Sequence, residues 1–412
     1  MNQPTLQKQM IWNAIGSFIY LVCQWLLVVL VTNMGGFSDA GVLSIAMSVS
    51  ATFQTVAMFG IRSFQVSDLT EEYTDTHYVG FRLVTCTLSL LLCVVFSLIT
   101  HYWGIQLLAI FLFMLFRLAE SFSDVLHGIA QKNDRLDIAG KSFAIKGIGL
   151  LLVFYLSFRF LGNLCFSLFL IAVFSLLSTA FYDWVVVRRL SCFSLLFNPI
   201  KTAPMALKTL PLCIYLFFHS ALSTVPKIFL ERLSGEELLG AYSSIFAPAL
   251  LISTAVGFLY QPFVAKFATA WHEQDGKRFL KLLFRFVIAI AVIGGLALFV
   301  AHFLGEFAFV LIFGEQIREY LYLLTPILVA ICGVALIAFL GTVETVLRDF
   351  LGLIVGCGVG VAFELASAQW LIRTFGANGA SYAHISATTL GSIIMLVRIL
   401  YLISRKQRES HI

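Results

Sequence analysis

Apolar stretches of 18 or more residues recur from one end of this 412-residue chain to the other. Each stretch is long enough to cross a bilayer core of about 30 Å as an α-helix. Only 12% of the residues are charged, about half of the roughly 25% found in soluble globular proteins. The sequence therefore predicts an all-α polytopic membrane protein. We expect no cleavable signal peptide, because the polar start MNQPTLQKQM runs straight into a full-length span.

We predict about twelve spans, so both chain ends are expected on the same side of the membrane. The least certain boundary is at 305–319, where GEFAFVLIFGEQIRE fits a loop, a helix end or a re-entrant segment. The predicted spans are residues 10–33, 42–65, 80–100, 105–130, 138–161, 164–187, 207–232, 239–265, 281–303, 319–346, 350–373 and 378–403.

Lysine and arginine are distributed unevenly between the two sides of the predicted bundle. The side opposite the termini is expected to hold only Arg159, Arg232, Arg318 and Arg373. Positive residues are retained in cytoplasmic loops, so we expect both termini to be cytoplasmic. The formal net charge of +5 fits this bias, and we expect no nucleic-acid partner.

The chain offers little that is typical of an enzyme. Its 8 cysteines fall mostly inside predicted spans and have no metal-binding spacing, so we expect neither a metal site nor disulfides. The predicted outer loops are short, and no GxSxG, P-loop or HExxH motif occurs. We therefore expect no catalytic residues and no transport driven by the chain's own ATP hydrolysis.

A weak internal repeat divides the chain. A shift of 199 residues places GGFSDAGVLS (35–44) over SGEELLGAYS (234–243), so that Gly36 matches Gly235. Six spans separate the matched segments, which gives the halves the same orientation, and substrate sites tend to lie between such repeats. The predicted N-terminal six-helix lobe, cytoplasmic connection and C-terminal six-helix lobe are residues 1–187, 188–206 and 207–412.

Several basic residues lie inside spans, although a charge near a bilayer centre costs about 2.5–3.5 kcal/mol. Lysine and arginine bind phosphate oxygens through charge-assisted hydrogen bonds. We therefore predict an anion site, while Arg62 also fits an interface anchor near a helix end, and Lys141 and Lys227 fit side chains that reach back to the interface. The candidate substrate ligands are Arg62, Arg117, Lys141, Lys146 and Lys227.

Acidic residues accompany these bases. Glu120 follows Arg117 by three residues, a spacing that also fits a pair whose charges cancel. That leaves Asp124 to face Lys141 or Lys146 across the neighbouring hairpin. Glu344 and Glu364 are the candidate sites for a coupling proton or sodium ion. Outside this set, we expect Arg82, Arg285 and Arg398 to reach the interface and Asp183 to be interfacial.

The chain resembles the polysaccharide flippases of the multidrug/oligosaccharidyl-lipid/polysaccharide (MOP) exporter superfamily, which carry O-antigen and capsule repeat units. The resemblance spans nearly the whole chain, through loose motifs. These are GGFSDAGVLSIAMSVS (35–50), HGIAQKNDRLDIAGKSFAIKGIG (127–149), GEELLGAYSSIFAPALLISTAVGFLYQPFV (235–264) and FGANGASYAHI (375–385).

The resemblance implies two six-helix bundles around a central cavity in a bacterial cytoplasmic membrane. It implies a flippase that carries an undecaprenyl-diphosphate-linked oligosaccharide to the outer leaflet by alternating access, alongside a glycan polymerase and glycosyltransferases. A MATE-like drug/cation antiporter is the main alternative, which the basic candidate residues disfavour. A non-transporting membrane component or enzyme of glycan assembly is the third, which the short outer loops disfavour.

Overall fold

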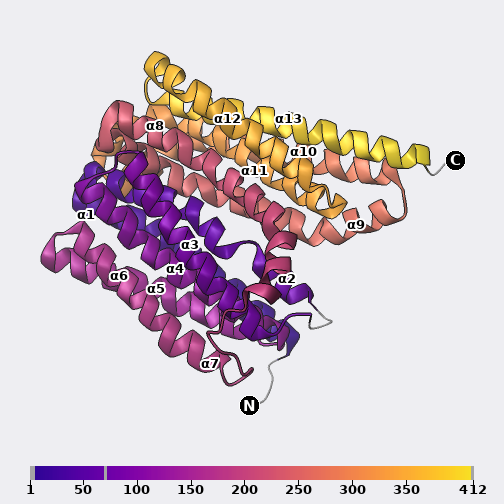
Figure 1. Cartoon of the computed structure of the whole chain (residues 1–412). Helices are drawn as coiled ribbons and strands as arrows, with labels where there is room; N and C mark the ends of the chain where they lie inside the picture. The colour runs from indigo at the N-terminus through magenta and orange to yellow at the C-terminus, as the bar shows by residue number, and fades with distance from the viewer. Residues whose placement is uncertain (1–4, 69–71, 410–412) are drawn as a thin grey trace. The chain divides into compact units, whose positions relative to one another are not determined.

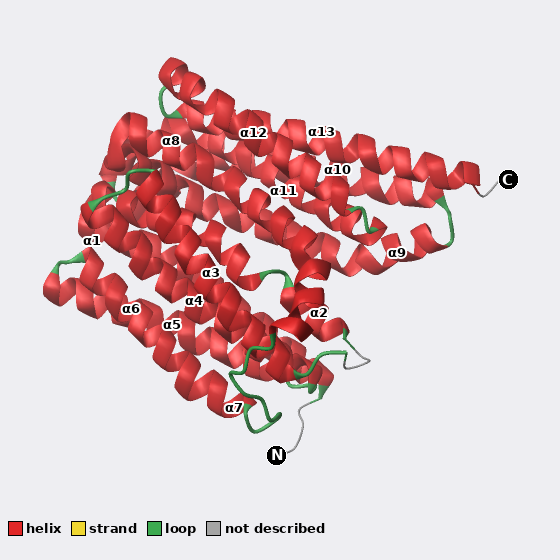
Figure 2. Ribbon diagram, in the orientation of Figure 1, coloured by secondary structure: helices red, strands yellow, loops and turns green. Residues whose placement is uncertain are grey.

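The computed structural model describes residues 5–68 and 72–409, and all regular structure in this part of the chain is helical (Figure 2). The chain divides into two compact units, Met1–Ser220 and Ala221–Ile412. The division falls inside one long helix, later in the chain than the predicted lobe boundaries at 187 and 207. Each unit is described by itself.

The first unit is built from the helices that precede residue 220 (Figure 1). They are α1 (Leu6–Met58), α2 (Ile61–Ser67), α3 (Asp75–Ile99), α4 (Gly104–Lys132), α5 (Leu136–Leu161), α6 (Leu164–Ser178), the π-helix η1 (Thr179–Trp184), α7 (Val185–Val187) and the start of α8 (Pro199–Tyr260).

The second unit begins within α8 and contains the remaining helices (Figure 1). They are the 3-10 turn η2 (Gln261–Phe263), α9 (Val264–His272), α10 (Gly276–Phe313), the 3-10 segment η3 (Glu315–Leu323), α11 (Leu324–Leu347), α12 (Phe350–Phe375) and α13 (Asn378–Glu409).

Ten helical stretches of the described chain are long and apolar enough to cross a membrane. Two of them, Leu6–Ser67 with 62 residues and Pro199–His272 with 74, are far longer than one crossing needs. Each is broken by a non-helical glycine, Gly36 in α1 and Gly235 in α8. Counting both as two crossings gives 10 + 2 = 12, in agreement with the number of spans predicted.

Gly36 and Gly235 adopt almost the same backbone conformation. The φ and ψ angles are 80° and −176° at Gly36, and 86° and 171° at Gly235. This region of backbone conformation is open essentially to glycine alone. The two positions are the pair that the 199-residue shift aligned (36 + 199 = 235), so the two units repeat the same hairpin.

A second correspondence joins the ends of the two units. Helices α5 and α12 each have 26 residues, and their starts differ by 350 − 136 = 214 positions. The same shift relates the starts of α6 and α13 (378 − 164 = 214). It also relates Gly162 (φ 59°) and Gly376 (φ 61°), two glycines with positive φ that follow α5 and α12. The repeat thus extends over the final helix pair of each unit.

The uncertain segment 305–319 is a helix end followed by a 3-10 turn. Helix α10 continues to Phe313 before η3 begins, so its 38 residues reach well past the predicted span end at 303. Of the three alternatives for this segment, the helix end is confirmed. Few apolar side chains of α10 are buried, as expected of a helix that faces lipid.

Helix α4 is the centre of the first unit, because α1, α3, α5 and α6 all pack against it. Helices α1 and α5 approach each other closely at Gly16 and Gly140. A Cβ on either glycine would clash with backbone of the other helix. Small residues allow this backbone contact, which is a usual means of helix association in membranes.

We predict that Gly36→Ala and Gly235→Ala each lower the stability of the purified protein. No heavy atom lies within 4 Å of a Cβ at either position, so the loss comes from backbone strain, about 1–3 kcal/mol. Gly295→Ala in α10 is the matched control, since it also meets open space but is helical. Thermal unfolding in detergent measures the effect, and equal unfolding temperatures for all three variants would contradict it.

Candidate functional site

The first unit contains a cluster in which two arginines share one carboxylate. Arg62 of α2 contacts Asp124 of α4 at 3.1 Å, and Arg82 of α3 contacts its other oxygen at 3.0 Å. Arg62 also donates to Gln131 (3.2 Å), and Arg82 donates to the carbonyl of Ala57 (2.6 Å). The cluster carries two positive charges and one negative charge.

Exposure differs sharply between the two arginines. The side chain of Arg82 is 0% exposed, whereas that of Arg62 is 28% exposed and that of Asp124 is 14% exposed. The expectation that Arg82 reaches the interface is wrong, because two turns into α3 it is held by Asp124 and a carbonyl. Arg62 is therefore the accessible member of the cluster, and Arg82 supports it from behind.

The predicted partners of Asp124 are also wrong. Asp124 bonds to neither Lys141 nor Lys146, because Arg62 and Arg82 occupy its carboxylate. Lys146 instead reaches Ser123, the preceding residue of α4. Successive residues of an α-helix point about 100° apart, so Ser123 faces α5 while Asp124 faces α2 and α3.

Lys146 lies in a separate, buried ion pair. Its ammonium donates to Asp183 at 2.6 Å, to Thr179 at 3.1 Å and to Ser123. These bonds use all three of its donors. The ring of His127 contacts the other oxygen of Asp183 at 3.2 Å. Asp183, expected at the interface, is fully buried.

The π-helix η1 contributes two residues to this ion pair. Thr179 begins η1 and Asp183 lies four residues later. Single π-helical turns inside longer helices often mark functional positions. Here the turn presents a hydroxyl and a carboxylate together to Lys146.

Arg117 and Glu120 form the intrahelical pair that their spacing allowed, at 2.7 Å. The arginine also lies over the rings of Phe113 and Phe116, at 5.2 and 5.6 Å. Gln54 of α1 approaches the same Glu120 oxygen at 3.4 Å. The charges of Arg117 and Glu120 therefore compensate each other within α4.

Lys141 lies near the start of α5, where its side chain is 40% exposed. It contacts Asp137 at 3.0 Å, and Arg135 contacts the other oxygen of that residue at 2.9 Å. Its ammonium also lies 5.6 Å from the ring centre of Trp12. The exposure and the tryptophan contact agree with an interfacial lysine.

The second unit holds the other three predicted residues. The ammonium of Lys227 lies 4.4 Å from the ring centre of Phe246. Glu364 of α12 contacts His384 of α13 at 3.1 Å, and both side chains are buried. Glu344 of α11 is also buried, and it is not part of the Glu364–His384 pair.

Sequence reasoning missed Arg82, Asp183, His127 and His384 as members of buried networks. All four lie inside apolar helices, and that position was the available signal. Arg82 and Asp183 were assigned from their nearness to predicted span ends. Nearness to a span end does not show which way a side chain turns.

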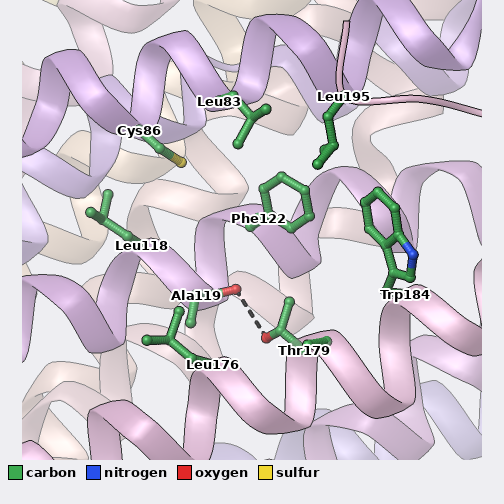
Figure 3. A pocket seen from close by; sticks show the side chains of 10 residues that line it. Leu83, Cys86, Leu118, Ala119, Phe122, Leu176, Thr179, Trp184 and Leu195 are labelled. Carbon is green, nitrogen blue, oxygen red and sulfur yellow. Dashed lines mark hydrogen bonds between the residues drawn. The ribbon is translucent and has the colours of Figure 1, made fainter.

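An apolar groove of about 440 Å³ lies between α3, α4 and η1 (Figure 3). Phe122 and Trp184 stack in its lining with ring centres 6.1 Å apart. The hydroxyl of Thr179 is turned toward the carbonyl of Ala119, at 3.4 Å. This lining suits a hydrocarbon chain and offers no charged group for a diphosphate.

We predict that Lys146→Met lowers stability by about 3–5 kcal/mol, because it leaves Asp183 buried without its cation. Lys146→Met combined with Asp183→Leu should recover most of this loss. Lys141→Met is the control, since a half-exposed pair contributes at most about 1 kcal/mol.

Thermal unfolding and membrane abundance measure these effects. If Lys146→Met is as stable as the parent protein yet inactive, Lys146 acts on substrate instead.

The comparisons with known proteins agree with this architecture. No protein-family model matches the sequence. Over 307 residues the chain is 25% identical to the capsular polysaccharide biosynthesis protein CapF of Staphylococcus aureus, an alignment that covers 74% of this chain and 76% of CapF.

Solved structures match over nearly the whole chain. An inward-facing MATE multidrug transporter of the MOP superfamily has a TM-score of 0.71 at 12% identity, covering 97% of this chain and 99% of that one. The lipid II flippase MurJ, in an inward closed conformation, has a TM-score of 0.70 at 13% identity, covering 94% and 87%. This multi-pass membrane protein therefore has the transporter fold shared by MATE proteins and MurJ, as the sequence predicted.

Proposed function

We propose that this protein is a flippase for lipid-linked oligosaccharides. It moves an undecaprenyl-diphosphate-linked oligosaccharide from the cytoplasmic to the outer leaflet of a bacterial cytoplasmic membrane by alternating access. Both termini are cytoplasmic, and the exported glycan serves cell-surface polysaccharide synthesis. A glycan polymerase and glycosyltransferases act on the same material, and a proton or sodium gradient drives the cycle.

One comparison supports lipid flipping as the reaction, and another supports a glycan as the substrate class. MurJ is described as a lipid II flippase, and its fold matches that of this chain. CapF is described as a capsular polysaccharide biosynthesis protein, and it is similar over about three quarters of each chain. Together they favour a lipid-linked glycan as the cargo.

The observation that carries the proposal is the Arg62–Asp124–Arg82 cluster. Its excess positive charge lies in a low-dielectric region, where an uncompensated charge is costly. A lipid diphosphate would supply the missing negative charge through charge-assisted hydrogen bonds. Arg62 is the member exposed enough to meet it.

In this proposal Arg62 exchanges its carboxylate partner, Asp124, for the diphosphate during the cycle. Without substrate, Asp124 holds both Arg62 and Arg82. When the diphosphate arrives, Arg62 turns to it and Asp124 keeps Arg82 in place. A ligand shifts a conformational equilibrium only if it binds the two states differently, and this exchange provides such a difference.

The other predicted bases take different roles in this proposal. Arg117 and Lys146 are each paired with a carboxylate within 3.0 Å, and of these two pairs Lys146–Asp183 joins different helices. Lys141 shares Asp137 with Arg135 near the start of α5, as an interfacial lysine. Lys227 in the second unit remains the candidate to receive the diphosphate later in the cycle. Its ammonium rests on the ring of Phe246.

A MATE-like drug/cation antiporter is the second candidate, because a MATE transporter matches the fold as well as MurJ does. A cation carrier needs acidic groups available to its substrate. In the first-unit cluster the only carboxylate, Asp124, is already shared by two arginines. This arrangement favours an anionic cargo.

We predict that Arg62→Gln reduces export of surface glycan by about 10- to 100-fold while protein abundance stays near normal. A charge-assisted hydrogen bond contributes about 1.5–3 kcal/mol, and each 1.4 kcal/mol is about tenfold. Arg62→Lys should retain part of the export, because it keeps the positive charge.

Arg285→Gln is the matched control for export, since this exposed arginine on α10 lies outside the cluster. Normal export by Arg62→Gln, at normal abundance, would show that the cluster does not bind the cargo.

A further inference from the structure

Glu344 is an unusual carboxyl group in the second unit. It lies one turn before the end of α11, and its side chain is completely buried. Neither of its side-chain oxygens has a hydrogen-bond partner, and no other buried carboxyl group in residues 5–68 and 72–409 shares this property. A buried carboxylate with no hydrogen bond is very costly, so the arrangement favours the neutral, protonated form of Glu344.

A second carboxyl group lies close by. A Cβ built on Gly352 of α12 would lie under 3.0 Å from both Glu344 Oε1 and Asp349 Oδ2. The two oxygens are therefore at most 3.0 + 3.0 = 6.0 Å apart. Two carboxyl groups this close do not both ionise readily, and the absence of a side chain at Gly352 leaves room for them.

An arginine is bonded to the second of these carboxyl groups. Arg398 of α13 holds Asp349 through two bonds, at 2.6 and 3.2 Å. Among the described residues, Asp349 at the N-cap of α12, Cys357 of α12 and Arg398 of α13 are titratable groups near Glu344. The side chains of Asp349 and Arg398 are 9% and 36% exposed, whereas Glu344 is 0% exposed. Exposure thus rises in steps from Glu344 through Asp349 to Arg398.

Glu364 provides a contrast within the same unit. It is equally buried, but one of its oxygens contacts the ring of His384 at 3.1 Å. A proton in that pair has an internal partner. Glu344 has no such partner, and it lies beside Asp349 and Arg398, whose side chains are increasingly exposed.

We propose that Glu344 binds the coupling proton and exchanges it through Asp349 and Arg398. The proton leaves the Glu344 carboxyl group, crosses to the Asp349 carboxylate by way of a bridging water molecule and is released from there to bulk water. Arg398 then compensates the Glu344 carboxylate that remains, and reprotonation reverses these steps. The inference rests on the proposed transport function, because a coupling proton needs a transport cycle to drive.

The first test measures proton binding without transport. Infrared difference spectra of the purified full-length protein, recorded across a pH titration, should contain a protonated-carboxyl band that Glu344→Gln removes. Glu306→Gln, an exposed carboxyl group that pairs with Arg318, should leave this band in place. A spectrum of Glu344→Gln identical to that of the parent protein in this region would overturn the assignment.

A second variant keeps the test decisive if Glu344→Gln does not fold. Arg398→Gln removes the cation that compensates the Glu344 carboxylate, so the midpoint of the same band should rise by about one pH unit. An unchanged midpoint would overturn the role of Arg398.

The third arm measures coupling in proteoliposomes. An imposed pH gradient should accelerate lipid transfer by the parent protein and not by Glu344→Gln, and acceleration by a sodium gradient alone would overturn proton coupling. If the parent protein moves no lipid but the Glu344-dependent band is present, the proposed function fails while the proton site stands.

Discussion

The shared bonding of Asp124 organises the first unit. Its two oxygens join α2, α3 and α4 through Arg62 and Arg82, in a region where an unpaired charge costs several kcal/mol. The same constraint explains Lys146, which finds Asp183, and Arg117, which finds Glu120. Those two pairs are neutral, whereas the Asp124 cluster carries excess positive charge that is available to an anion. Lys141 and Arg135 also share one carboxylate, Asp137, but this group lies at the start of α5.

The repeated architecture places this charge in one unit only. Gly36 and Gly235 break equivalent helices with the same backbone conformation, so both units are built on one plan. The buried networks differ, however: the first unit joins arginines and lysine to aspartates, while the second places Glu364 on His384 and leaves Glu344 without a hydrogen bond. A duplicated scaffold thus allows the proposed binding of an anion and of a proton to lie in different units.

Much of the fold could be predicted from the sequence, because bilayer thickness fixes span length and the glycine at each hairpin has few alternatives. The Arg117–Glu120 pair was also accessible, since its partners are three residues apart on one helix. The partners of Asp124 and Lys146 could not be predicted from the sequence. The rise per residue gives the depth of a side chain, but helix packing sets its direction, and α4 turns Ser123 toward α5 and Asp124 toward α3.

The most direct test of the central claim is the binding of lipid diphosphate by the purified protein. Native mass spectrometry should show that the parent protein retains an undecaprenyl-diphosphate lipid in preference to an uncharged lipid of the same chain length. Arg62→Gln should lose most of this preference, and Arg285→Gln should keep it. Equal retention of charged and uncharged lipids by the parent protein, or an unchanged preference in Arg62→Gln, would contradict the account.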